Sequence, residues 1–160
     1  MNQVTLYLAG GLFNAAEQIH NLYLEKYLEE LGYHVILPQR EALKFKNDDY
    51  FDIPGIVDDC AKCAISPLYI YVGCIDGTGA DDGTCVEYGM AIAIKGEAIV
   101  YRTDIRTAID REVGVNAMLR AKGTKLVLYP CFLTELEQID DFYKSLSQKI
   151  HEAVRSLNNV

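Results

Sequence analysis

The 160-residue sequence contains no tryptophan, only four prolines and no apolar run of the length that a membrane-spanning helix requires. Such a helix takes about 20 consecutive, predominantly apolar residues. The first residues also lack the positively charged segment and the apolar stretch of a secretory signal peptide. We therefore expect a cytoplasmic protein without a membrane partner.

Cysteines are too few and too scattered for the disulfide framework of a small secreted domain. Two of the five, Cys60 and Cys63, match the C-x-x-C pattern, but no second pair of cysteines or histidines follows to complete a zinc site. A redox pair is expected at a helix start, whereas this pair falls near the end of an expected helix. We expect buried, unpaired thiols and no metal.

Basic residues are outnumbered, because 15 lysines and arginines stand against 23 acidic residues, for a formal net charge of −8. No run or stripe of basic residues appears. Binding to a nucleic acid or to an anionic membrane depends on clustered positive charge. The composition therefore argues against a nucleic acid polymer and is compatible with a small neutral or cationic substrate.

Short apolar segments alternate with segments of helical periodicity along the whole chain. The expected strands are residues 4–8, 33–37, 68–74, 98–101 and 125–129. The expected helices are residues 14–32, 53–64, a segment around 86–94, 115–121 and 136–157. Such alternation is typical of parallel βαβ units with helices on both faces of the sheet. We expect a single α/β domain over residues 1–160, a three-layer sandwich with a five-stranded parallel sheet.

The most informative segment is residues 81–89 (DDGTCVEYG), at the expected junction of a loop and a helix. In open α/β sheets, ligands bind where strands lead into helices, so Asp81 and Glu87 are placed where chemistry would occur. The same segment also fits a capping box, in which Glu87 would reach back to the cap at Thr84. A helix cap needs only one acidic residue, but Asp76, Asp81 and Asp82 all precede Glu87 in this loop. The additional acidic residues favour a functional site.

Three motifs, in order, resemble those of the nucleoside 2-deoxyribosyltransferases, which are small flavodoxin-like enzymes that move 2-deoxyribose between nucleobases. Residues 7–13 (YLAGGLF) are similar to the family's first-strand motif, and residues 81–89 are similar to its catalytic motif. Residues 115–118 (VNAM) resemble its Asn-Leu-Met segment, with alanine in place of leucine. The resemblance covers nearly the whole chain and implies nucleosides and free bases as partners, without a cofactor.

The resemblance also implies roles for individual residues. Glu87 would be the nucleophile that attacks the anomeric carbon, and Tyr7 would orient its carboxylate. Asp81 would help to protonate the departing base. The expected substrate-binding residues are Phe13 and Asp58 at the base, Gly10 and Gly83 within the motifs, and Asn116 and Met118. Asp59 lies beside Asp58, so either of them could be the residue that contacts the base.

In this family, Asn116 and Met118 would reach into the site of a neighbouring subunit, which implies a homo-oligomer. The implied chemistry is a double displacement. Cleavage of a glycosidic bond generates an oxocarbenium-like centre that a carboxylate can trap as a covalent intermediate. A second base then takes the sugar with ping-pong kinetics, and a competing water gives hydrolysis as a side reaction.

Two alternative functions are also compatible with the sequence. A nucleotide N-glycosidase of the same fold would hydrolyse 5′-monophosphates, but its phosphate cradle of Ser, Arg and Gly after the first strand is replaced here by Leu12 and Phe13. A non-catalytic flavodoxin-like binding module would leave Glu87 as a helix cap only. The glycines of residues 77–83 lack the G-x-G-x-x-G spacing of a dinucleotide site, so they do not indicate a cofactor.

Overall fold

A computed structural model describes residues 3–106 and 114–157 of the chain. Its centre is a sheet with the strand order β2-β1-β3-β4-β5. The strands are β1 (Thr5–Ala9), β2 (His34–Ile36), β3 (Tyr69–Cys74), β4 (Ala98–Arg102) and β5 (Thr124–Leu128). Every neighbouring pair is parallel. The predicted five-stranded parallel sheet is therefore confirmed, with no strand end shifted by more than one residue.

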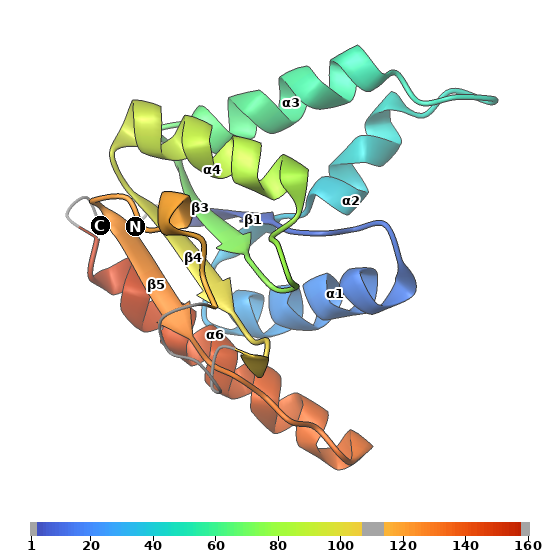
Figure 1. Ribbon diagram of the computed structural model, residues 1–160. Coiled ribbons are helices and arrows are strands. Elements are labelled where there is room, and N and C mark those ends of the chain that lie inside the picture. Colours follow the sequence, from blue (N-terminus) through green and yellow to red (C-terminus); the bar gives the residue numbers. More distant parts are fainter. Residues whose placement is uncertain (1–2, 107–113, 158–160) are drawn as a thin grey trace.

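Helices cover both faces of this sheet, as Figure 1 shows. The helices α1 (Ala15–Glu30) and α6 (Ile139–Arg155) pack together on one face. The other face carries α3 (Ile53–Ile65) and α4 (Asp82–Lys95), which also contact each other. A short helix α2 (Pro38–Glu41) and a 3₁₀ turn η1 (Ala42–Phe45) lead from β2 toward α3. The three-layer, flavodoxin-like architecture follows from this arrangement.

The protein has two hydrophobic cores, one on each face of the sheet, because successive side chains of a strand point to opposite faces. Leu6 and Leu8 of β1 pack with α1 and α6 in one buried cluster. Tyr7 and Ala9, the alternate residues of the same strand, belong to a second cluster with α3 and α4. Both clusters contain buried tyrosines, for example Tyr101 of β4 in the first and Tyr71 of β3 in the second.

Two predicted helices differ from the observed ones. The segment 115–121 contains only a 3₁₀ turn, η2 (Ala117–Leu119), in place of the expected helix. A second 3₁₀ turn, η3 (Leu136–Gln138), precedes α6, so the last α-helix begins three residues later than predicted. No helix within residues 3–106 and 114–157 is long and apolar enough to span a membrane.

Candidate active site

A cavity of about 650 Å³ lies beyond the carboxyl end of β1, between α2, α3 and the start of α4. In a parallel sheet this end is where ligands bind. Glu87 of α4 and Cys60 of α3 line this cavity, and Gly10, Leu12 and Phe13 contribute from the loop after β1. Further lining residues come from the segments around α2, α3 and α4: Pro38, Ala42, Phe51, Ile53, Ile56, Val57, Ala61, Asp81, Asp82, Gly83, Thr84, Val86 and Met90.

The first turn of α4 is capped by Asp81 and not by the predicted capping box of Thr84 and Glu87. Asp81 is the N-cap, and its Oδ2 accepts hydrogen bonds from the backbone N–H of Thr84 at 2.9 Å and from the Thr84 hydroxyl at 3.0 Å. A Cβ on Gly83 would lie 3.2 Å from this Oδ2, so glycine leaves room for the carboxylate. The capping-box interpretation of Thr84 and Glu87 is therefore wrong, and Glu87 is left for another role.

Glu87 lies in the second turn of α4 and faces β1. The Tyr7 hydroxyl donates a hydrogen bond of 2.9 Å to its Oε1, joining two residues that are 80 positions apart in sequence. Tyr7 is almost completely buried. The Tyr71 hydroxyl donates at 2.8 Å to the backbone carbonyl of Thr84, which ties the first turn of α4 to β3. The position of the Glu87 carboxylate is thus fixed by a hydrogen bond from β1 and by the attachment of α4 to β3.

Burial raises the pKa of Glu87 from its ordinary value of 4.5 to about 7, although hydrogen bonds from Tyr7 and Cys60 act in the opposite direction. The charge of Asp81 raises the pKa of Glu87 further. Burial, followed by the nearby Glu87 charge, also raises the pKa of Tyr7 far above its usual range, so Tyr7 remains a hydrogen-bond donor. A desolvated carboxylate with a pKa near neutrality is poised for nucleophilic or acid–base chemistry.

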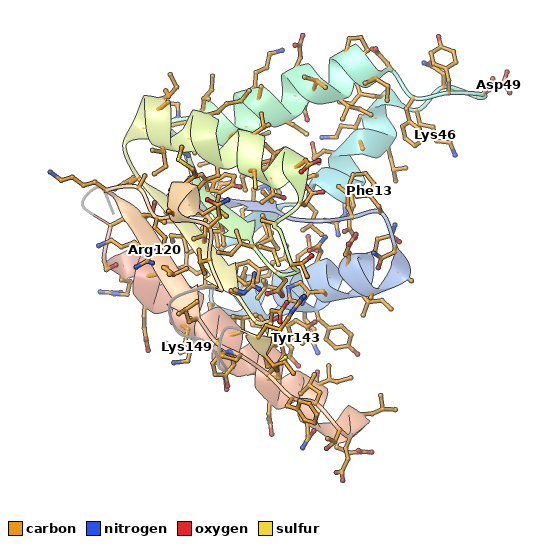
Figure 2. All side chains as sticks on the ribbon, viewed as in Figure 1. Phe13, Lys46, Asp49, Arg120, Tyr143 and Lys149 are labelled. Carbon is orange, nitrogen blue, oxygen red and sulfur yellow. The ribbon has the colours of Figure 1, made fainter. Side chains whose placement is uncertain are left out.

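Much of the cavity lining is apolar and exposed to solvent. Phe13 is 79% exposed, and Ile53 and Val57 of α3 are 61% and 57% exposed. Figure 2 shows Phe13 on the loop that leaves β1, beside α2. Phe51 lies nearby on the segment before α3, where a bridge pairs it with Lys46. Exposed aromatic and aliphatic groups in a cavity suit the flat, weakly polar faces of a nucleobase.

Of the other predicted substrate-binding residues, two line the cavity and the rest lie outside it. Gly10 and Gly83 line the cavity. Asp58 is exposed on α3 and Asp59 is half-buried, and neither of these two described residues belongs to the cavity lining. The charge of Asp59 contributes to the raised pKa values of Lys44, Cys63 and Cys60.

Asn116 and Met118 lie outside the cavity of their own chain. Asn116 is the N-cap of η2, and its side chain accepts a hydrogen bond of 3.0 Å from the backbone N–H of Met118. The Met118 side chain is 80% exposed, whereas the neighbouring Leu119 is buried against the core. The turn therefore presents Asn116 and Met118 on the surface.

Cys60 is a site residue that the sequence interpretation missed. It lines the cavity beside Glu87, whereas the sequence suggested only a buried structural thiol. Helical spacing from Ile53, Ile56 and Val57 would have placed Cys60 on their face of α3, but nothing in the sequence shows that this face borders Glu87. No group of three or more His, Cys, Asp or Glu side chains among the described residues could hold a metal ion.

This fold and site define an α/β protein with a cavity that contains the buried-strand partner Glu87 at the carboxyl end of its sheet. The sequence profile of the family described as nucleoside 2-deoxyribosyltransferase matches residues 6–146. The chain therefore belongs to the nucleoside 2-deoxyribosyltransferase family. Membership supports nucleoside glycosyl transfer as the broad class of activity and small molecules as partners.

One similar solved structure is described as a conserved protein from Enterococcus faecalis V583. The identity is 18% and the TM-score 0.67, with 95% of this chain and 99% of that chain covered. At this identity the likeness concerns the fold alone. A search of curated proteins found no match to the chain.

Proposed function

We propose that the protein transfers 2-deoxyribose between nucleobases through a covalent deoxyribosyl-Glu87 intermediate. The observation that carries this proposal is the placement of Glu87, which accepts a hydrogen bond from the buried Tyr7 and lines a cavity whose other lining residues are mostly apolar. The proposed substrates are nucleosides and free bases, and the proposed setting is nucleotide salvage in the cytoplasm.

In the first half-reaction a Glu87 oxygen bonds to the anomeric carbon as the bond from that carbon to the base nitrogen breaks. The departing base takes the bonding electron pair and receives a proton from Asp81. In the second half-reaction an incoming base attacks the same carbon, gives its proton to Asp81 and releases Glu87. Water in place of the second base gives hydrolysis.

The cavity lining favours a nucleoside over a nucleotide. A 5′-phosphate needs cationic or backbone N–H partners, usually arginine or lysine. Among the described residues that line the cavity there is no lysine or arginine, whereas two acidic residues, Asp81 and Asp82, are present. This composition disfavours the alternative of a 5′-monophosphate N-glycosidase.

One assay separates the candidate functions. The protein is incubated with a 2′-deoxynucleoside and a different free base, and in parallel with the corresponding 5′-monophosphate. We expect a new deoxynucleoside in the first reaction and no base release from the monophosphate. Base release from the monophosphate alone would identify the N-glycosidase, and no turnover in either reaction would favour a binding module.

We also propose that the site is completed by a neighbouring subunit. Asn116 and Met118 are exposed on their own chain, as residues that reach into another site need to be. The apolar side chains around the cavity, among them Phe13, Ile53 and Val57, are exposed as well and would be covered by such a neighbour. A symmetric homodimer is the simplest assembly that pairs these surfaces reciprocally.

Mixing two inactive variants is expected to restore activity if the site is shared. Glu87→Ala and Asn116→Ala subunits are prepared separately, mixed in equal amounts and allowed to exchange. Randomly paired dimers should recover roughly a quarter of the wild-type activity, because one site of each hybrid contains both native residues. A mixture that stays inactive despite demonstrated exchange, or a fully active dilute monomer, would contradict a shared site.

A further inference from the structure

Two polar residues interrupt the buried face of α1. Asn21 and Glu25 are almost completely buried, on the same helix as the buried Leu24 and Leu28. Asparagine is a poor helix former in a helix interior, and burying its amide costs free energy unless the amide is hydrogen-bonded. Polar residues that break the apolar pattern of a helix in this way are expected to serve something other than the stability of that helix.

The Asn21 side chain joins two segments that contribute to the cavity lining. Its Nδ2 donates one hydrogen bond of 3.0 Å to the backbone carbonyl of Gly11, in the loop after β1. The same atom donates another of 2.8 Å to Oε1 of Gln39, on α2. The loop and α2 both supply residues of the cavity lining, namely Gly10, Leu12, Phe13 and Pro38.

Neighbouring side chains of α1 bind the same two segments. The backbone N–H of Phe13 donates a hydrogen bond of 2.8 Å to Oε2 of Glu17. Arg40 of α2 donates to both carboxylate oxygens of Glu25, at 2.6 and 2.8 Å. Glu17, Asn21 and Glu25 are spaced four residues apart, so they lie on one face of α1. Of these three side chains, Asn21 is the one that bonds to both the loop and α2.

We propose that Asn21 is a positioning residue that ties the loop of residues 10–13 to α2 and so holds Phe13 in the arrangement that binds a nucleobase. This inference rests on the proposed function, because the nucleobase is the ligand proposed for the cavity. It goes further in assigning a role to a residue that is itself outside the cavity lining and acts only through the loop and α2.

The expected effect is on binding and not on the chemical step. The Phe13 side chain is largely exposed, so its placement depends on the backbone of its loop more than on side-chain packing. A loop that is ordered before the ligand arrives does not lose conformational freedom on binding, which favours affinity. The hydrogen bond between Tyr7 and Glu87 does not involve this loop. Loss of the Asn21 bonds should therefore raise KM for the nucleoside and leave kcat nearly unchanged.

The test compares Asn21→Ala, Gln39→Ala and the double variant in deoxyribosyl transfer. Asn21→Ala removes both bonds, and KM should rise about tenfold with kcat within about twofold of wild type. Gln39→Ala removes only the bond to α2, and KM should rise about threefold. The double variant should match Asn21→Ala, because the second substitution removes a bond that is already lost. Gln39 is half-buried on a short helix, so its variant keeps the test decisive if Asn21→Ala does not fold.

The matched control removes a buried hydrogen bond far from the cavity. Tyr33 precedes β2, at the amino end of the sheet, and its hydroxyl bonds to Nδ1 of His151 at 2.7 Å. Tyr33→Phe should lower the melting temperature and leave KM unchanged. A rise in KM of the same size in Tyr33→Phe, or a loss in Asn21→Ala that falls on kcat instead of KM, would overturn the inference.

A second measurement needs no turnover and separates this inference from the proposed function. Binding of adenine, as the free-base probe, is measured by calorimetry in wild type and in the same variants. Binding that is about tenfold weaker in Asn21→Ala, about threefold weaker in Gln39→Ala and unchanged in Tyr33→Phe would support the inference even if no transfer were detected. Equal affinity in wild type, Asn21→Ala and Gln39→Ala would overturn it even if transfer were confirmed.

Discussion

Replacing Glu87 by glutamine is expected to reduce deoxyribosyl transfer by at least about a thousandfold and, at the same time, to stabilise the protein at pH 8. The amide cannot form the glycosyl bond, yet its carbonyl can still accept the hydrogen bond from Tyr7. The gain in stability has a separate cause, which is the removal of a half-buried negative charge. Turnover and the free energy of unfolding are measured on the same preparation.

The expected pH dependence of stability follows from the raised pKa of Glu87. Because this pKa is about 7 in the folded protein and ordinarily 4.5, the folded state binds more protons than the unfolded state between these values. The free energy of unfolding therefore falls as the pH rises through this window, by up to about 3 kcal/mol from this group. Glu87→Gln should remove that slope and be more stable than wild type above pH 7.

An exposed acid provides the matched control. Glu152 is exposed on α6, which covers the opposite face of the sheet, and Glu152→Gln should leave turnover unchanged. If Glu87 served only as a helix cap, Glu87→Gln would remain active with nearly unchanged stability, because glutamine can take the place of glutamate in a capping box. That outcome would contradict the nucleophile assignment.

Replacing Asp81 by asparagine is the second change with a large expected effect. Asparagine is as good an N-cap as aspartate, so the bonds to Thr84 should persist and stability should change little. Transfer should nevertheless fall about a hundredfold or more, because an amide cannot deliver the proton that the departing base needs. The measurement is turnover with bases of different leaving ability, together with the melting temperature.

Leaving-group dependence separates proton delivery from substrate positioning. A 7-methylpurine deoxynucleoside carries a cationic base that departs without a proton, so Asp81→Asn should process it nearly as fast as wild type. Asp81→Ala should lose the cap as well, at a cost of about 1 kcal/mol in stability. Equal losses for all leaving groups in Asp81→Asn would show that Asp81 only positions substrate.

The fold could be predicted from the sequence because its determinants are local. Alternating apolar residues such as Leu6 and Leu8 define a strand, and Asn14 caps α1 through a hydrogen bond to the backbone N–H of Glu17, three residues ahead. The start of α4 was harder to predict. Asp81 and Thr84 are both good caps, and only the folded geometry shows that Asp81 takes this role.

Only those site residues that belong to a family motif could be predicted from the sequence. Tyr7 and Glu87 are 80 positions apart, and no periodicity predicts their hydrogen bond, so their pairing was expected only from the family resemblance. Cys60 was missed because its significance depends on how α3 packs on α4. Asn116 lies outside the cavity lining of its own chain, so its role in the site stays a prediction.

Trapping the intermediate tests the central claim most directly. The protein is mixed with a 2′-deoxynucleoside without an acceptor base, quenched in acid and examined by intact-mass and peptide mass spectrometry, with Glu87→Gln as the control. The proposed mechanism predicts that wild type gains the mass of one deoxyribosyl group on the peptide containing Glu87, and that Glu87→Gln gains none. An adduct on another residue, or transfer without any adduct, would contradict it.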